Sequence, residues 1–259
     1  MPFIQELLLK IPTILLGIII VMSSVILAVI TIQAVHYFIP YRKHNKTSGV
    51  TMILFGTKTL IYSVLVSLVL FTAWSDFKSA GLNVQREADC LIELHRSTEA
   101  FLPKIKEETH VLLEEYTRSV INDEWKTLTR SELSPHTTEI AKNIWKVYTA
   151  YSPQTETEQI FLQESIRKLY ELRECRSTRL TDSKTGINPF LWLVLIAGEI
   201  AVIASIAFFA EDLRSKLSMS IFFAVLIGII FFTIILYDFP FTGEMFVSPE
   251  PLKQALLYW

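Results

Sequence analysis

Apolar and polar positions divide this chain into two apolar pairs that flank a long, charged middle. The apolar runs are Thr13–Phe38 and Val50–Trp74 before the middle, and Pro189–Ala210 and Leu217–Tyr237 after it. Each run is poor in charge and has about 20 residues or more, the length that a helix needs to cross a hydrocarbon core of roughly 30 Å. The pattern therefore predicts four transmembrane helices.

The predicted fold is all-α, with a helical soluble domain between two membrane hairpins. We expect an N-terminal hairpin over residues 1–74, the soluble domain over 75–188, a C-terminal hairpin over 189–237 and a terminal surface segment over 238–259. The first apolar run is far longer than the apolar core of a signal peptide, so we expect it to be retained as a membrane helix.

Apolar spacing and helix-start signals predict the helices of the middle. Ser75–Leu102 is expected to continue the second span as one long helix, and Pro103 to begin the next. Ser134-Pro135 and Ser152-Pro153 each pair a favoured N-cap with proline at the first helical position, which marks two further starts. The last helix is expected from about Thr155 to Thr181.

The residues after the fourth span carry turn signals. Asp238, Pro240 and Gly243 follow one another closely; proline cannot extend a helix, and glycine allows a turn. We expect the chain to fold back here along the membrane surface. Ser248-Pro249 would then start a short terminal helix.

Composition and motifs argue against several classes of function. The formal net charge is −2, a balance that gives no reason to expect nucleic acid as a partner. The sequence has no nucleotide-binding glycine loop, nucleophile elbow or His-Glu-x-x-His helix, and its five histidines show no ligand spacing. We therefore predict no enzyme, no cofactor and no metal site.

The chain has two cysteines, Cys90 and Cys175, too few for a disulfide framework. If helices continue out of the second and third spans, both thiols stand at a similar height, roughly 20 Å from the bilayer at 1.5 Å per residue. Two buried free thiols are the first interpretation. A disulfide is the alternative, and it would place the domain outside the cytoplasm.

A stripe of small, hydroxylated and then apolar residues runs along the second span; we call it the second-span stripe. Its members are Gly56, Thr59, Ser63, Ser67, Leu70, Phe71 and Trp74. Small and hydroxylated residues let membrane helices pack closely and hydrogen-bond across an interface. Repeated around a symmetric oligomer, the same stripe would line a narrow polar pore closed by a ring of apolar side chains. Both interpretations stay open at this point.

Two ionisable residues lie within the predicted spans, Lys58 in the second and Glu199 in the third. An unpaired charge at bilayer depth is costly, so such residues usually face a partner or water. Both residues sit at comparable depth and have opposite charge, which predicts an intramembrane ion pair. The alternatives are that Lys58 extends towards the short loop, or that both residues serve an ion pathway.

An ordered set of motif residues covers most of the chain. Its most specific part is Asp238-x-Pro240-Phe241-x-Gly243, followed by Val247-Ser248-Pro249-Glu250. The earlier members are His44-Asn45, Gly49, Gly56, Trp74, Ala80, Glu87-Ala88, Leu94, Leu102-Pro103, Tyr116, Glu124-Trp125, Arg176, Arg179-Leu180, Pro189, Leu191-Trp192 and Gly198. In this set the chain resembles the bacterial bestrophin-like family. It departs from the family pattern at Lys46, Glu199 and Phe239, so the family's ion preference does not carry over directly.

The resemblance implies a function and an assembly. Bestrophins are pentameric ion channels whose second membrane helix lines the pore and whose apolar neck includes phenylalanine. Carried over, the resemblance implies a homo-oligomer, most simply a pentamer, with Ser63, Ser67, Leu70 and Phe71 lining the pore. It also implies a bacterial inner-membrane protein with its soluble domain in the cytoplasm. Basic residues do not settle this orientation, because they are denser in the short loops but more numerous on the domain side.

The leading hypothesis is a passive ion channel whose partners are copies of itself, the lipid bilayer and small ions. Lys58 and the family resemblance favour anions, whereas Glu199 favours cations. The competing class is a non-conducting membrane scaffold or sensor whose helical domain binds a partner. A secondary transporter ranks third, since the chain lacks inverted repeats and broken helices.

Overall fold

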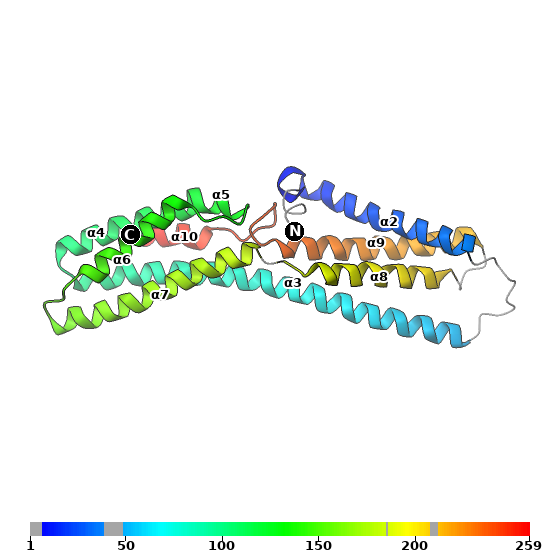
Figure 1. The fold of residues 1–259 in the computed structure, drawn as a ribbon, viewed down its shortest axis with the longest axis horizontal. Helices are drawn as coiled ribbons and strands as arrows, with labels where there is room; N and C mark the ends of the chain where they lie inside the picture. The colour runs from blue at the N-terminus through cyan, green and yellow to red at the C-terminus, as the bar shows by residue number, and fades with distance from the viewer. Residues whose placement is uncertain (1–6, 39–48, 185, 208–211) are drawn as a thin grey trace. The chain divides into compact units, whose positions relative to one another are not determined.

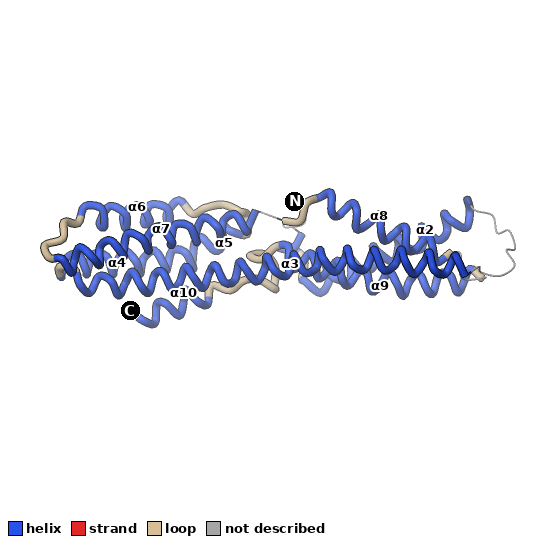
Figure 2. Tube along the Cα trace, turned by 90° about the horizontal axis from the view of Figure 1, so that it is seen from below, coloured by secondary structure: helices blue, strands red, loops and turns tan. Residues whose placement is uncertain are grey.

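The computed structural model describes residues 7–38, 49–184, 186–207 and 212–259 (Figure 1). Helices make up most of these residues, which contain no strand (Figure 2). Four helices are long and apolar enough to cross a membrane: α2 (Thr13–Phe38), α3 (Gly49–Ser97), α8 (Pro189–Ile206) and α9 (Leu213–Asp238). The all-α class and the four predicted spans are therefore confirmed. Residues 208–210, the end of the third predicted span, lie outside the described residues.

The chain divides into two compact units. The membrane unit comprises the described residues of Met1–Ser75 and Gly186–Asp238, and the helical unit those of Asp76–Thr185 and Phe239–Trp259. The long helix α3 is unbroken from Gly49 to Ser97, so the second span continues into the soluble domain as the apolar spacing predicts.

In the membrane unit, α2 and α9 lie side by side along much of their length (Figure 1). Glycine makes their close approach possible: a Cβ atom at Gly228 would lie 2.8 Å from the Cα of Val21. Ala28, Ile203 and Ala224 pack in the same unit as a small buried cluster with Ile32. Small residues at the contact let the two backbones approach closely, as in other membrane helix pairs.

Replacing Gly228 with alanine should loosen this helix pair. The added methyl group meets backbone of α2 rather than a movable side chain, and overpacking of this kind destabilises a protein by about 1–3 kcal/mol. The midpoint of thermal unfolding in detergent should therefore fall. Gly81→Ala is the control, because nothing lies within 4 Å of a Cβ atom there and alanine favours a helix by up to about 1 kcal/mol. Equal midpoints for Gly228→Ala and the parent chain would contradict the prediction.

The helical unit is built from one end of α3 and a series of shorter helices. They are η1 (Thr98–Ala100), α4 (Pro103–Ser119), the π-helical turn η2 (Val120–Glu124), α5 (Trp125–Leu128), α6 (Pro135–Ala150), α7 (Glu156–Lys184), α10 (Glu250–Ala255) and η3 (Leu256–Tyr258).

One of the two predicted serine caps is confirmed and the other is wrong. Ser134 caps α6, and its hydroxyl accepts a hydrogen bond from the backbone N–H of Thr137. Helix α7 begins at Glu156, as predicted from about Thr155 but three residues later than Ser152-Pro153 predicts, and the Thr155 hydroxyl accepts from the N–H of Glu158 instead. The Glu158 carboxylate in turn accepts from the Tyr151 hydroxyl and the Gln154 N–H. These bonds keep the chain in a loop at Ser152-Pro153 and move the helix start to Glu156.

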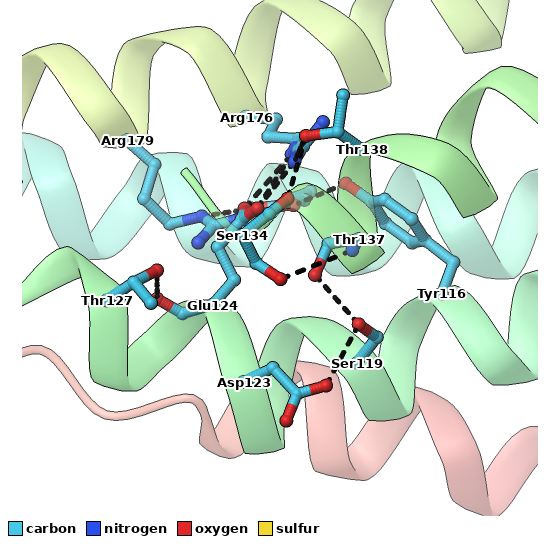
Figure 3. A network of polar contacts seen from close by, with 11 residues as sticks. Tyr116, Ser119, Asp123, Glu124, Thr127, Ser134, Thr137, Thr138, Arg176 and Arg179 are labelled. Carbon is cyan, nitrogen blue, oxygen red and sulfur yellow. Dashed lines mark hydrogen bonds and ion pairs between the residues drawn. The ribbon is translucent and has the colours of Figure 1, made fainter. Parts of the chain in front are cut away.

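A buried network of charges holds α3, η2 and α7 together (Figure 3). Arg179 is fully buried and donates to Glu87 at 2.8 and 3.0 Å and to Glu124 at 2.9 Å. Arg176 donates to the same Glu124, and Tyr116 donates to Glu87. Burial alone would raise the pKa of Glu124, but hydrogen bonds from Arg176 and the charge of Arg179 hold that pKa below its ordinary value. Two arginines and two glutamates thus neutralise one another inside the unit.

The C-terminal segment packs into the helical unit rather than lying on the membrane surface as the sequence suggested. Phe241, Val247, Leu252 and Ala255 share one buried core with residues of α3, α4 and α6. The predicted turn and terminal helix are present: Gly243 has a φ of 89°, and α10 follows Pro249. Leu252 and Ala255, three residues apart, give α10 a buried face, and the core of the helical unit covers that face.

The two cysteines are free and buried, as the first interpretation predicts. Cys90 on α3 and Cys175 on α7 are hydrogen-bonded to each other, which together with burial raises the pKa of the Cys90 thiol. The Cys90 thiol also lies 3.8 Å from a carboxylate oxygen of Glu171. These contacts make the two thiols part of the packing between α3 and α7.

Three aromatic rings stack where the terminal segment meets α3 and α4. The rings of His95 and His110 lie 3.7 Å apart, and the ring of Trp259 is stacked 5.3 Å from His95. Glu99 and Lys106 are the other charged groups that face His95. Burial, followed by the neighbouring His110, lowers the pKa of His95.

Acidification should therefore loosen the terminal segment. Because the pKa of His95 is lower in the folded chain than its unfolded value of about 6.5, the unfolded state binds this proton more readily. The stability that neutral His95 contributes is present above that value and falls as the pH drops through it. We expect the amides of residues 250–259 to exchange with deuterium faster at about pH 5.5 than at about pH 7.5, after correction for the intrinsic rate. His95→Gln should remove most of this difference; an unchanged difference would exclude His95 as its source.

Candidate pore-lining face

Helix α3 buries one face within the membrane unit. Tyr62, Val66, Val69 and Ala73 recur at helical spacing and are all buried. The Tyr62 hydroxyl donates to the carbonyl of Leu195 on α8 at 3.0 Å. A Cβ atom at Gly198 would lie 2.5 Å from the Tyr62 ring, so glycine allows α8 to pack directly on this face. The contact fixes which side of α3 faces the other membrane helices of the same chain.

The second-span stripe lies on a different side of α3, most of which the described residues leave uncovered. Gly56, Ser63 and Ser67 are exposed, and the side chains of Phe71 and Trp74 are 62% and 42% exposed. Thr59 and Leu70, nearer the buried face, are partly exposed. Nothing lies within 4 Å of a Cβ atom at Gly56. Leu70 packs against the buried core of the membrane unit, and the Thr59 hydroxyl is buried. Gly56, Ser63, Ser67 and Phe71 are left largely uncovered by the described helices of one protomer.

The two serines of the stripe satisfy their own hydroxyl protons. Ser63 donates to the carbonyl of Leu60 at 2.8 Å, and Ser67 donates to the carbonyl of Ser63 at 2.7 Å. A hydroxyl bonded back along a helix in this way has its proton satisfied without a partner outside the helix, and each oxygen keeps its lone pairs for a contact outside the helix. The hydroxyl of either serine could turn outwards and donate to an anion. It could also keep its bond to the helix carbonyl, accept a hydrogen bond from water or coordinate a cation through its oxygen.

Aromatic side chains follow the hydroxyl part of the stripe. Phe71 lies about one turn beyond Ser67, and its ring contacts the ring of Trp74 with centroids 5.8 Å apart and planes at 45°. Leu70 directly precedes Phe71 and packs against the buried core of the membrane unit. Polar side chains are thus followed by apolar ones along this side of α3.

The structure does not bring Lys58 and Glu199 together within one protomer. Lys58 is exposed on α3, whereas Glu199 on α8 is buried with 1% exposure, and the described residues include no ion pair between them. Glu199 is hydrogen-bonded to the Ser24 hydroxyl and lies near Tyr62. Tyr62, one turn further along α3 than Lys58, lies beside Glu199 instead.

Sequence reasoning missed Ser24 and Tyr62 as the groups around Glu199. The only available signal was the buried carboxylate itself, which requires some polar neighbour. One of its oxygens, Oε1, has no hydrogen-bond partner among the described residues. Among the described residues, no three His, Cys, Asp or Glu side chains lie close enough together to hold a metal ion.

The fold and this mostly uncovered stripe define an all-α membrane protein with four spans and a helical domain between its hairpins. The family described as Bestrophin-like domain matches residues 22–252. The chain therefore belongs to the bestrophin-like family. The motif residues His44-Asn45, and Lys46 beside them, lie outside the described residues.

Solved structures share this fold at low sequence identity. Two variants of a bacterial bestrophin homologue from Klebsiella pneumoniae are similar to the chain, with TM-scores of 0.67 and 0.64 and identities of 14% and 15%. Each comparison covers 93% of this chain and 98% of the other. A structure named only as a membrane protein is similar at a TM-score of 0.65, with 12% identity over 93% of this chain and 96% of its own. Among curated protein sequences none matches significantly.

Proposed function

We propose that the protein is a passive ion channel in which several copies, most simply five, surround a pore lined by the second-span stripe. One observation carries this proposal: the stripe combines glycine and hydroxyl groups on a membrane helix, yet Gly56, Ser63 and Ser67 are exposed in the protomer. A ring of copies would place these groups around a shared aqueous path. Membership of the bestrophin-like family supports the same arrangement.

The proposed pore has a polar part and an apolar part. Ser63 and Ser67 supply hydroxyl oxygens, and Leu70, Phe71 and Trp74 supply the apolar end. A narrow apolar ring can stop ions by excluding water without closing sterically. Of the three side chains we propose Phe71 as the constriction, because it is the most exposed and its ring can move by rotation about one side-chain bond.

We propose that the channel prefers anions, and this preference rests on the family resemblance. Glu199 is buried inside the protomer, so its charge is kept away from the stripe. Lys58 lies one turn from the buried Tyr62 and therefore points to the side of α3 that faces α8, outside the stripe. Neither intramembrane charge would then set selectivity directly.

We place the protein in the bacterial inner membrane with its helical unit in the cytoplasm. The four apolar helices support membrane insertion. Cys90 and Cys175 are close to each other but not bonded, which agrees with a reducing compartment. Labelling of a cysteine introduced on the exposed face of α7, from one side of intact spheroplasts, would test the orientation.

Reconstitution in planar bilayers with asymmetric potassium chloride tests the function. A channel gives discrete current steps, and anion preference moves the reversal potential towards that of chloride. The mass of the detergent-solubilised particle, measured by native mass spectrometry, tests the assembly, and a monomer under mild conditions would contradict it. An intact oligomer with no current steps would instead favour the scaffold or sensor hypothesis.

A further inference from the structure

A cavity of about 180 Å³ lies in the helical unit between α4, α6 and α7. The aliphatic part of its lining, which we call the floor, consists of Ala141, Ile144, Leu169 and Leu172. An engineered protein cavity of about 150 Å³ is large enough to bind benzene. The cavity is therefore of the right size for one small ring or a short branched chain.

Basic groups line the cavity beside this floor. Arg176 uses its Nε and Nη2 atoms to bind Glu124 and Thr138, and its Nη1 atom has no hydrogen bond among the described residues. Arg173, one turn away on α7, also lines the cavity and is exposed. It forms no ion pair within the part of the chain that the structure describes.

The charges around the cavity do not cancel. Arg176 and Arg179 are neutralised by Glu87 and Glu124 in the buried network. Besides Arg173 and Arg176, the cavity is lined by one more basic residue, Lys142, which forms an exposed pair with Glu139 at 3.5 Å. Of the basic residues that line the cavity, Arg173 is the one without an ion pair among the described residues, and it lies one turn from Arg176 on α7.

One wall of the cavity is aromatic. Trp145 on α6 lines it, and the ring of Tyr170 on α7 packs edge-on against Trp145 with centroids 4.9 Å apart. This contact holds the indole ring of Trp145, which gives the cavity an aromatic surface beside the floor. Apolar surface with a few convergent polar groups is typical of small-molecule sites.

We propose that this cavity binds a small organic anion, a carboxylate that carries a single ring or a short branched chain. The apolar body lies on the floor against Trp145, and the carboxylate is bound by Arg173 and the Nη1 atom of Arg176, through charge-assisted hydrogen bonds. The site lies in the helical unit and goes beyond the proposed channel activity. Binding requires no conduction, so the two proposals can fail separately.

Benzoate is the probe for this site. Isothermal titration of the full chain in lipid nanodiscs, with empty discs as the blank, should show saturable binding. Arg173→Gln should weaken binding about tenfold or more, because a charge-assisted hydrogen bond is lost. Arg167→Gln is the matched control on the same helix: Arg167 is exposed, pairs with Glu164 and Glu171 and does not line the cavity. Its affinity should equal that of the parent chain.

Two further measurements decide the outcome. Ala141→Leu fills the floor of the cavity and should abolish binding; if this variant does not fold, Arg173→Gln still tests the site. Benzyl alcohol, which has the ring without the charge, should bind much more weakly than benzoate. Absence of saturable benzoate binding by the folded parent chain would overturn the proposal. Equal binding of both probes, or equal binding by the Arg173→Gln and Arg167→Gln variants, would overturn the assigned anion site.

Discussion

Replacing Phe71 with alanine should raise the ion current through the reconstituted protein about tenfold, if the aromatic ring adds about 1.4 kcal/mol to the barrier for passage. Phe71 is 62% exposed on the proposed pore-lining side of α3 and packs only partly, against Trp74. Alanine would widen the constriction and let water fill it. Single-channel recording would show the change as higher open probability, higher leak or larger steps.

Leu68→Ala is the matched control for the Phe71 variant. Leu68 is an apolar side chain of the same helix with similar exposure, 61%, about one turn away and outside the stripe. Its replacement should leave the current unchanged. Unchanged currents in Phe71→Ala, Leu70→Ala and Ser67→Ala alike would remove the second span from the pore. The assembly itself could then still be tested by mass.

Replacing Arg179 with methionine should destabilise the helical unit by about 3–5 kcal/mol, because breaking a buried ion pair leaves an uncompensated charge. Arg179 and Glu87 are both fully buried, and Arg179 supplies two of the hydrogen bonds that Glu87 accepts. Without the arginine, Glu87 keeps only the Tyr116 hydroxyl among the contacts shown in the network. Thermal unfolding in detergent, followed by circular dichroism, would measure the loss.

Arg118→Met is the control for Arg179, since it removes an arginine from an exposed pair with Glu114 on one helix. Such pairs contribute about 0.3–0.5 kcal/mol. Adding Glu87→Gln to Arg179→Met should restore part of the lost stability, because the buried carboxylate is then neutral. If the single variant unfolded at the same temperature as Arg118→Met, the network would not have the role that its burial indicates.

The local features of the fold were predictable because they depend on neighbouring residues. Length and apolarity alone located the spans, and α2 begins and ends at the predicted Thr13 and Phe38. Proline and a serine cap located the start of α6 at Pro135. The helix start predicted at Ser152-Pro153 was wrong because the Glu158 carboxylate, in the first turn of α7, accepts hydrogen bonds from Tyr151 and Gln154. These bonds hold Ser152-Pro153 in a loop, and the sequence pattern does not show them. Where two helix-start signals lie close together, hydrogen bonds of this kind decide at which of them the helix begins.

The sequence by itself determined the four spans, the long helix α3 and the composition of the second-span stripe, because hydrophobic length and helical periodicity are properties of the chain. Only the tertiary structure decided which side of α3 stays uncovered, since that depends on where α8 packs against Tyr62. It also paired Arg179 with Glu87, which is 92 positions away, and placed Tyr62 rather than Lys58 beside Glu199. Contacts between distant segments are set by how helices pack together, and no periodicity within one helix specifies its neighbour.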